Sequence, residues 1–395
     1  MQIPDLSQFP EVGWALALSL SWLFGEAMAR WLSLPRISSY ALCGFIAANF
    51  SGGVLNIAHH DALLLLSNIA FGLILFELGY RINLLWLRRN PWLTLTGFAE
   101  ALLCFIAVFF CARWFGCEDL IALLLAALAM SSSPAGVLRI INEKKAAGQV
   151  TERVLHLAAL NCVLAVFLFK LIVAFWVMQQ QGQILPALSH SLLILLASVA
   201  LGLLFGMVLP SLCQRLLNPA HDITLAFTFA IILLVVLTHA LRLSPILASL
   251  SFGLMARHRR LTLNQAQRNF GALGDLFAVL LFFYAAATLD WHRIQQGLLL
   301  GALLIVVRIA CKLSVCTGLA YLSGISVRKG FLTGLALTPI SVFVILMLEQ
   351  TRYIGISLLD ELAPLAAMTL LLDVAGPILT QRALIWARET PPNPQ

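Results

Sequence analysis

The chain has 395 residues, of which 61% are hydrophobic and only 11% are charged, and its net charge is +7 at pH 7. Soluble globular domains carry about 25% charged residues, so this composition excludes that class of protein. The hydrophobic residues recur in stretches close to the length of about 20 residues that crosses a bilayer as a helix. The short alternating segments of a membrane β-barrel are not visible. The sequence therefore predicts an all-α membrane protein in contact with the lipid bilayer.

In chain order, the hydrophobic stretches predict thirteen transmembrane helices, of which the second and the ninth are short. The first stretch has no basic region before it and no small-residue cleavage site, so we expect a retained helix rather than a signal peptide. No linker or soluble domain interrupts the series, so residues 1–395 are predicted to form one transmembrane domain. The helices are expected at residues 11–33, 36–51, 61–82, 91–114, 119–142, 152–178, 186–213, 222–241, 243–257, 268–289, 295–321, 328–350 and 358–384.

The basic residues predict the orientation of these helices, because Lys and Arg are enriched in loops that face the cytoplasm. If the N-terminus lies outside, the C-terminus is cytoplasmic and the cytoplasmic segments hold eighteen of the 25 Lys and Arg residues. The external segments then hold only Arg113, Arg242, Arg293 and Arg352. This orientation explains the positive net charge, so we expect no nucleic-acid partner.

Two of the predicted helices are interrupted by proline. The fifth contains Ser131 to Ser133 followed by Pro134, and the twelfth contains Thr338 followed by Pro339. Proline removes a backbone donor, and nearby hydroxyls can satisfy the carbonyls that are left free. Each break falls in the middle helix of a three-helix unit, and the two units have opposite orientations. Such inverted repeats with two discontinuous crossing helices are typical of transporters, whose site lies near the bilayer midplane.

Charged residues inside a membrane are costly and therefore indicate function. Arg308 and Lys312 lie one turn apart in the eleventh predicted helix, where they could compensate the partial charges of the half-helix ends. Asp373 lies in the middle of the thirteenth helix, and we expect it either to pair with Arg308 or Lys312 or to carry a proton.

Further polar residues lie in the fourth and sixth predicted helices. Asn161 could be a ligand or a tie between helices, whereas Cys162 by residue type alone is best interpreted as a small buried hydrophobic side chain. Glu100 is a second carboxylate inside the membrane, and His156 could titrate near neutral pH, although histidine is also common at the interface. Asp373, Glu100 and His156 are therefore the candidates for a proton carrier.

Several segments, taken in order, resemble the monovalent cation–proton antiporters, in the branch of bacterial sodium–proton and potassium–proton exchangers. The resemblance covers nearly the whole chain. Its segments are Leu34 to Gly44, Phe71 to Gly79, Ser132 to Ala135, Gly148 to Glu152, Leu243 to Ala248, Ser251 to Leu254 and Phe282 to Asp290.

The resemblance implies a homodimer in the bacterial inner membrane, with no enzymatic activity and no cofactor. Part of each protomer would form a dimer scaffold, and the rest a mobile core that exposes one site to each side of the membrane in turn. The scaffold would comprise about residues 11–82 and 222–289, the core about residues 91–178 and 295–384, and residues 186–213 would form a linking helix.

In this family the ion site is an Asp–Asp or Asn–Asp pair with a Lys or Arg partner. Matched to this chain, the pair falls on Asn161 and Cys162, and the cationic partner on Arg308 or, less well, Lys312. The chain departs from the family at Cys162, because a neutral thiol is a poor ligand for a hard alkali cation. Either Asp373 or Glu100 supplies the missing carboxylate, or the thiolate takes the proton, or the substrate is not a cation.

We therefore expect a secondary antiporter that exchanges protons for Na⁺ or K⁺, with no metal site apart from that of the transported cation. The expected cation-binding residues are Asn161, Cys162, Ser131, Ser132, Ser133 and Thr338, with Arg308 and Lys312 compensating charge. An anion or organic-acid transporter with the same fold is an alternative, since no carboxylate is evident beside the two cations. A membrane scaffold or sensor without transport activity is another.

Overall fold

The computed structural model describes residues 10–50, 61–181, 184–216, 223–259, 270–345, 347 and 362–391, and all regular secondary structure in these residues is helical. The all-α class predicted from composition is therefore confirmed. The fifteen helices are α1 (Pro10–Trp31), α2 (Arg36–Phe50), α3 (Asp61–Arg81), α4 (Leu84–Arg89), α5 (Pro91–Trp114), α6 (Asp119–Ala129), α7 (Pro134–Lys144), α8 (Gln149–Gln181), α9 (Ile184–Leu216), α10 (Ile223–Ala240), α11 (Pro245–His258), α13 (Gly271–Ala287), α14 (Trp291–Gly318), α15 (Val327–Ala336) and α17 (Ala363–Trp386).

Nine helical segments of the described residues are long and apolar enough to cross a membrane, one of them formed by α6 and α7 together. Each of the thirteen predicted stretches contains a described helix, whereas the short helix α4 was not predicted. The twelfth stretch is described only in part, because residues 346 and 348–361 lie outside the described part of the chain. The number of thirteen transmembrane helices therefore stays a prediction.

Local sequence sets the ends of the helices at the first break. Helix α6 stops at Ala129, and α7 starts at Pro134, where the missing N–H of proline costs no helical hydrogen bond. Ser133 caps α7, because its hydroxyl accepts a hydrogen bond from the N–H of Gly136 at 3.0 Å. The same helix ends at Lys144, and its C-cap residue Lys145 is left-handed, with a φ of 49°. The predicted interruption at Pro134 is therefore present.

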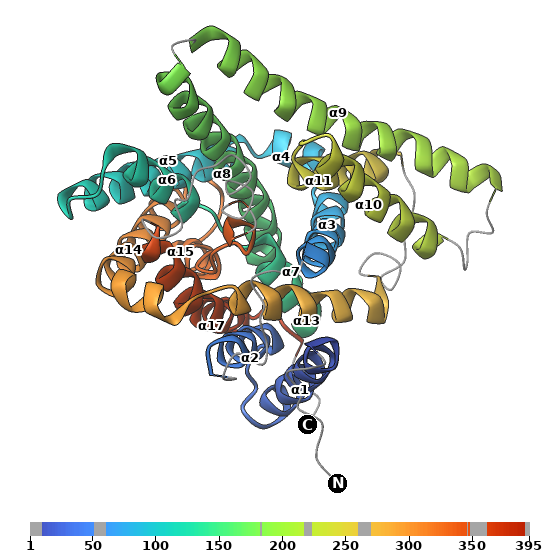
Figure 1. Cartoon of the computed structure of the whole chain (residues 1–395), viewed down its shortest axis with the longest axis horizontal. Helices are drawn as coiled ribbons and strands as arrows, with labels where there is room; N and C mark the ends of the chain where they lie inside the picture. The colour runs from blue at the N-terminus through green and yellow to red at the C-terminus, as the bar shows by residue number, and fades with distance from the viewer. Residues whose placement is uncertain are drawn as a thin grey trace.

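The helices pack in two groups. In the first packing group α1, α2, α3, α10, α11 and α13 contact one another, and α9 lies against α10 and α11. In the second packing group α5, α6, α7, α8, α14, α15 and α17 contact one another. Contacts of α2 with α17, and of α3 with α7 and α8, join the two groups. Figure 1 shows α14, α15 and α17 on one side of the molecule, α3, α10 and α11 on the other, and α9 along one edge.

An aromatic cluster holds the first packing group together. The ring of Phe76 in α3 lies 5.2 Å from that of Phe227 in α10 and 4.7 Å from that of Phe252 in α11. All three side chains are buried. Aromatic pairs at such distances stabilise by about 0.5–1.5 kcal/mol beyond their burial. Helix α3 is therefore fixed to α10 and α11 on one face, while another face meets α7 and α8.

The N-terminus of α8 is capped by a residue that lies far along the chain. The Glu389 carboxylate accepts hydrogen bonds from the N–H of Val150, the N–H of Thr151 and the Thr151 hydroxyl, each at 2.8 Å. The Glu389 carbonyl also accepts from the N–H of Ala147 at 2.9 Å. The carboxylate satisfies free donors at this helix end and places a negative charge beside its positive pole. The segment after α17 is therefore bonded to the start of α8.

Gly376 of α17 lies against the second break. A Cβ atom added there would lie 2.7 Å from the Cα atom of Pro339, so the backbone would have to move. We expect Gly376→Ala to lower the free energy of unfolding by about 1–3 kcal/mol, as overpacking does. Thermal unfolding in detergent measures the effect. The control is Gly318→Ala in α14, which meets no atom within 4 Å and should be neutral or stabilising. Equal losses in both variants would contradict this packing.

Candidate ion-binding site

The two breaks meet each other directly. The N–H of Ser133 donates to the carbonyl of Pro339 at 2.9 Å, and the Ser132 hydroxyl donates to the carbonyl of Leu337 at 3.1 Å. These residues are buried, so neither break can rely on bulk water for its hydrogen bonds. The extended segments that follow α6 and α15 therefore form one crossing inside the second packing group.

Arg308 of α14 satisfies carbonyls on both sides of this crossing. Its side chain is fully buried. All of its acceptors among the described residues are backbone carbonyls, those of Ala129 (2.7 Å), Ser131 (2.6 Å), Pro339 (3.1 Å), Leu337 (3.4 Å) and Thr338. The C-terminal ends of α6 and α15 carry partial negative charge, and the planar guanidinium can bind several carbonyls at once. Arg308 therefore offsets two helix dipoles rather than a side-chain carboxylate.

One turn further along α14, Lys312 binds a carboxylate. Its ammonium forms an ion pair with Oε1 of Glu100 in α5, and it also donates to the Ser132 hydroxyl at 3.0 Å and to the carbonyl of Met130 at 3.2 Å. Both Glu100 and Lys312 are fully buried. A buried charge of either sign is stable only when paired. The three oxygens around the Lys312 ammonium therefore form a small cage of oxygen ligands.

Asn161 of α8 completes this cluster. Its Nδ2 donates to Oε2 of Glu100 at 2.7 Å and lies 3.3 Å from the Ser132 hydroxyl. Its Oδ1 is buried and has no hydrogen-bond partner among the described residues. Cys162, next in the chain, is fully buried among hydrophobic side chains and forms no hydrogen bond with the described residues. The carboxylate nearest to Asn161 in this network therefore comes from α5.

The remaining predicted hydroxyls serve the helix ends. The Ser131 hydroxyl donates to the carbonyl of Leu128 at 2.7 Å, and the Thr338 hydroxyl donates to the carbonyl of Leu335 at 2.8 Å. Ser133 caps α7. The structure thus brings Ser132 to the Glu100–Lys312 pair, whereas the hydroxyls of the other three residues complete the backbone of the breaks.

Two predicted proton carriers lie apart from the Glu100–Lys312 pair. Asp373 of α17 is buried, and its Oδ2 has no partner among the described residues. The expected pairing of Asp373 with Arg308 or Lys312 is wrong, because the first binds backbone carbonyls and the second binds Glu100. His156 lies near α4, where its Nε2 accepts from the N–H of Asn83 at 3.1 Å and its Nδ1 lies 2.7 Å from the carbonyl of Glu152.

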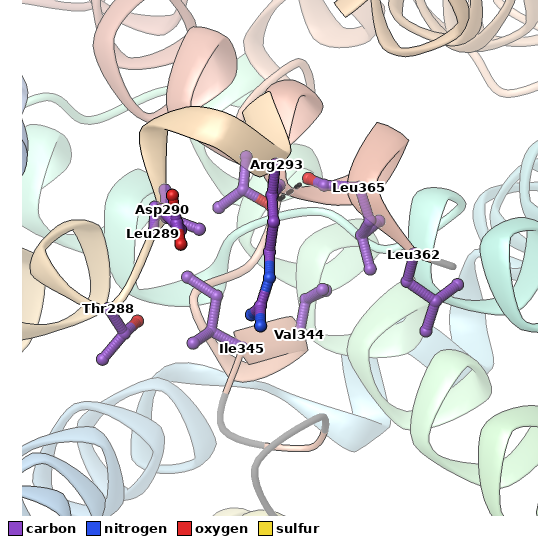
Figure 2. Close-up of a pocket in the computed structure, with 10 residues that line it drawn as sticks. Thr288, Leu289, Asp290, Arg293, Val344, Ile345, Leu362 and Leu365 are labelled. Carbon is purple, nitrogen blue, oxygen red and sulfur yellow. Dashed lines mark hydrogen bonds between the residues drawn. The ribbon is translucent and has the colours of Figure 1, made fainter. Parts of the chain in front are cut away.

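Two cavities lie where the packing groups meet. The larger has a volume of about 390 Å³ and is lined by Trp22, Glu26, Arg36, Ile37, Tyr40, Arg139, Asn142, Glu143, Asp275 and Ala278, from α1, α2, α7 and α13. The smaller has a volume of about 40 Å³ and lies at the other end of α13, next to the starts of α14 and α17. Figure 2 shows the Arg293 side chain directed into it beside Val344 and Ile345. Of these two cavities, the larger therefore lies on the side where α7 ends.

Sequence patterns missed two features of this region. The sequence could not assign the carbonyls of Ala129, Met130 and Leu337 to this region, because residue type does not show which backbone carbonyls act as acceptors. Asn142, which contacts α3 across the packing groups, stands beside Glu143 and reads as an ordinary polar helix end. Only the position of Asn142 near the end of α7, the helix that follows the first break, could have suggested that it contacts another helix.

The Glu100–Lys312 pair predicts a strong coupling between its two residues. Glu100→Gln or Lys312→Met alone leaves a lone buried charge and should destabilise by about 3–5 kcal/mol. The double variant removes both charges, so it should lose less stability than either single variant. Reversible unfolding of all four proteins in detergent gives the coupling free energy. Additive losses in the double variant would contradict the pairing seen here.

Comparison with known proteins identifies relatives of the whole chain. Residues 16–386 match the family described as "Sodium/hydrogen exchanger, transmembrane". Two solved structures of the sodium proton antiporter MjNhaP1 from Methanocaldococcus jannaschii have a similar fold. The structure at pH 8 is 14% identical with a TM-score of 0.65, and covers 97% of this chain and 98% of its own. The structure from an electron-microscopy map is 15% identical with a TM-score of 0.71, and covers 95% of this chain and 98% of its own.

A search of curated proteins found no match. At identities of 14% and 15%, the two solved structures establish the fold alone. The family match carries more weight, because it extends over nearly the whole chain, as the resemblance predicted. The chain therefore belongs to the sodium/hydrogen exchanger family.

Proposed function

We propose that this chain exchanges protons for a monovalent cation, Na⁺ or K⁺, and that Glu100, Ser132 and Asn161 bind the cation at the crossing of the two breaks. One observation carries the assignment of the site. The Lys312 ammonium is held by a carboxylate, a hydroxyl and a backbone carbonyl, with the unpartnered Oδ1 of Asn161 nearby. Oxygen ligands of this kind suit hard alkali cations, so the ammonium stands where a transported cation would bind.

The proposed exchange is a competition between the cation and the Lys312 ammonium for Glu100. When a cation binds the Glu100 carboxylate, Lys312 leaves and gives up its proton to the side that is open. When the cation leaves on the other side, Lys312 takes a proton from that side and returns to Glu100. Cation and proton therefore occupy the pair alternately and move in opposite directions. A site that holds neither would leave the Glu100 carboxylate uncompensated in the protein interior.

This proposal accounts for the unusual residue at position 162. Cys162 offers no hard ligand and forms no hydrogen bond with the described residues. Glu100 reaches Asn161 from α5 instead, at 2.7 Å. A carboxylate is therefore still present beside the asparagine, although it is supplied by a different helix. The missing acidic residue at position 162 does not argue against cation transport.

The anion alternative has lost its main support. It rested on cationic side chains without a nearby carboxylate. Lys312 is paired with Glu100, and the guanidinium of Arg308 donates to backbone carbonyls of both breaks. Neither group is free to bind an anionic substrate. A scaffold without transport activity would have no reason to keep a buried ion pair that contributes little to stability by comparison with apolar packing.

The two packing groups suggest the moving parts. We take the first packing group as the dimer scaffold, the second as the mobile core and α9 as the linking helix. Both breaks, Arg308, Lys312, Glu100 and Asn161 lie within the second group, so its movement would carry the intact site. The cavities lie between the groups, where such movement would open one side and close the other. The proposed setting is a homodimer in the bacterial inner membrane, with the N-terminus outside and the C-terminus in the cytoplasm.

Exchange in proteoliposomes tests the function. We expect addition of Na⁺ or K⁺ to dissipate an imposed pH gradient, as read from a trapped pH dye, and Glu100→Gln to reduce exchange to the level of empty liposomes. Cys162→Ser is the matched control, because it changes the neighbouring polar atom without touching the ion pair, and it should keep exchange within about threefold of wild type. If Na⁺, K⁺ and Li⁺ all fail with wild-type protein at acidic, neutral and alkaline pH, the proposed function is wrong.

A separate comparison tests which carboxylate acts. Asp373→Asn keeps the size of a buried side chain that has no ion-pair partner among the described residues, so it should retain cation-coupled exchange. Glu100→Asp keeps the charge but shortens the reach to Asn161, and it should raise the KM for the cation more than it lowers the maximal rate. Loss of exchange in Asp373→Asn together with normal exchange in Glu100→Gln would assign the carboxylate of the exchange to Asp373 instead of Glu100.

A further inference from the structure

A polar contact joins α3 of the first packing group to α7 of the second. The Asn142 amide donates to Oε1 of Glu77 at 2.8 Å, and Arg81 donates to the same oxygen at 3.1 Å. Arg81 also donates to Oδ1 of Asn142. Glu77 is fully buried, and the Arg81 side chain is 14% exposed. The three side chains therefore close a hydrogen-bonded triangle across the boundary between the groups.

A second contact from the same helix crosses the boundary nearby. Arg139 lies three residues before Asn142 and therefore on a neighbouring part of the α7 surface. Its Nη1 lies 3.2 Å from Oδ1 of Asp275 in α13, and the pair is buried on the arginine side but exposed on the aspartate side. One face of α7 is thus bonded to two helices of the first packing group.

These contacts stand beside the larger cavity. Arg139, Asn142 and Glu143 of α7 line it on one side, and Ala278 and Asp275 of α13 line it on another. Its volume of about 390 Å³ compares with about 40 Å³ for the cavity at the other end of the boundary. The triangle is therefore formed in a state in which the larger of these two cavities is open on the side where α7 ends.

We propose that Glu77, Arg81 and Asn142 form a latch that stabilises this open state and must separate in every transport cycle. The inference rests on the proposed function in one respect, namely that the second packing group moves against the first. Displacement of α7 from α3 removes the Asn142 amide from the buried Glu77 carboxylate, and a buried polar group that loses its partner is costly. The latch therefore sets the balance between the two access states, as any contact made in only one state does.

Side-specific transport kinetics measure this balance. The ratio of the cation KM values on the two membrane faces reflects the ratio of the two states, so weakening one state changes the ratio by the same factor. Asn142→Ala should raise the KM on the side of the larger cavity, lower it on the other, and change their ratio by about tenfold. Asn90→Ala is the matched control, because among the described residues the Asn90 amide donates only to the carbonyl of Trp86 in its own segment. It should leave the ratio within twofold of wild type.

An exchange of the Glu77 carboxylate and the Asn142 amide distinguishes a latch from a general loss of packing. Glu77→Gln with Asn142→Asp exchanges the carboxylate and the amide between α3 and α7 and keeps Arg81 between them. The double variant should restore the wild-type ratio, whereas each single variant should shift it. A normal ratio in Asn142→Ala, or a double variant that is shifted as far as the single variants, would overturn the latch.

A labelling experiment gives a readout that does not require transport. Ala278→Cys places a thiol at the wall of the larger cavity, and mass spectrometry follows its reaction with a membrane-impermeant reagent added on that side. Adding Asn142→Ala should slow labelling severalfold, because the cavity is open for less of the time. If Asn142→Ala slows labelling but the wild-type protein shows no cation exchange, the latch is supported and the proposed function is rejected. Normal exchange with unchanged labelling would reject the latch alone.

Discussion

The fold depends on how the carbonyls at two helix breaks obtain hydrogen bonds in the absence of water. Each break frees carbonyls that a bilayer cannot hydrate, so the protein must supply the donors itself. Arg308 supplies most of them, since one guanidinium reaches carbonyls of Ala129, Ser131, Thr338 and Pro339. The direct bond from Ser133 to Pro339 completes the crossing. Because all these groups are fixed to one another, α6, α7, α14 and α15 form a unit whose geometry is set at its centre.

The ion pair follows from that fixed centre. Lys312 lies one turn from Arg308, so the helix that satisfies the breaks also delivers an ammonium to Ser132 and Glu100. The two cationic side chains thus have a division of roles. Arg308 offsets backbone dipoles, and Lys312 offsets a carboxylate. Under the proposed function, the same division leaves a carboxylate at the proposed site although Cys162 stands next to Asn161. In the structure, the acidic group that reaches Asn161 comes from α5 rather than from α8.

Much of this arrangement could be predicted from the sequence, because its signals are local. Pro134 and Pro339 within apolar stretches mark the breaks, and Arg308 in mid-helix marks a buried cation. The choice between Asp373 and Glu100 could not be predicted, because both are carboxylates deep in a predicted helix. Which one faces Lys312 depends on the rotation of each helix about its axis, and that is set by packing against neighbours rather than by depth. The role of Glu77 is likewise hidden, because an Arg four residues later explains it as a local pair.

The cap on α8 has a consequence for the order in which the protein is made. The N–H of Thr151 is satisfied by Glu389, which is 238 residues later in the chain. During synthesis the ribosome therefore releases the helix that carries Asn161 long before its cap exists. Until Glu389 has emerged, water or another acceptor must serve this helix end. The capping of this helix is thus a late event in biogenesis, which waits for the segment after α17 to return to a helix made early.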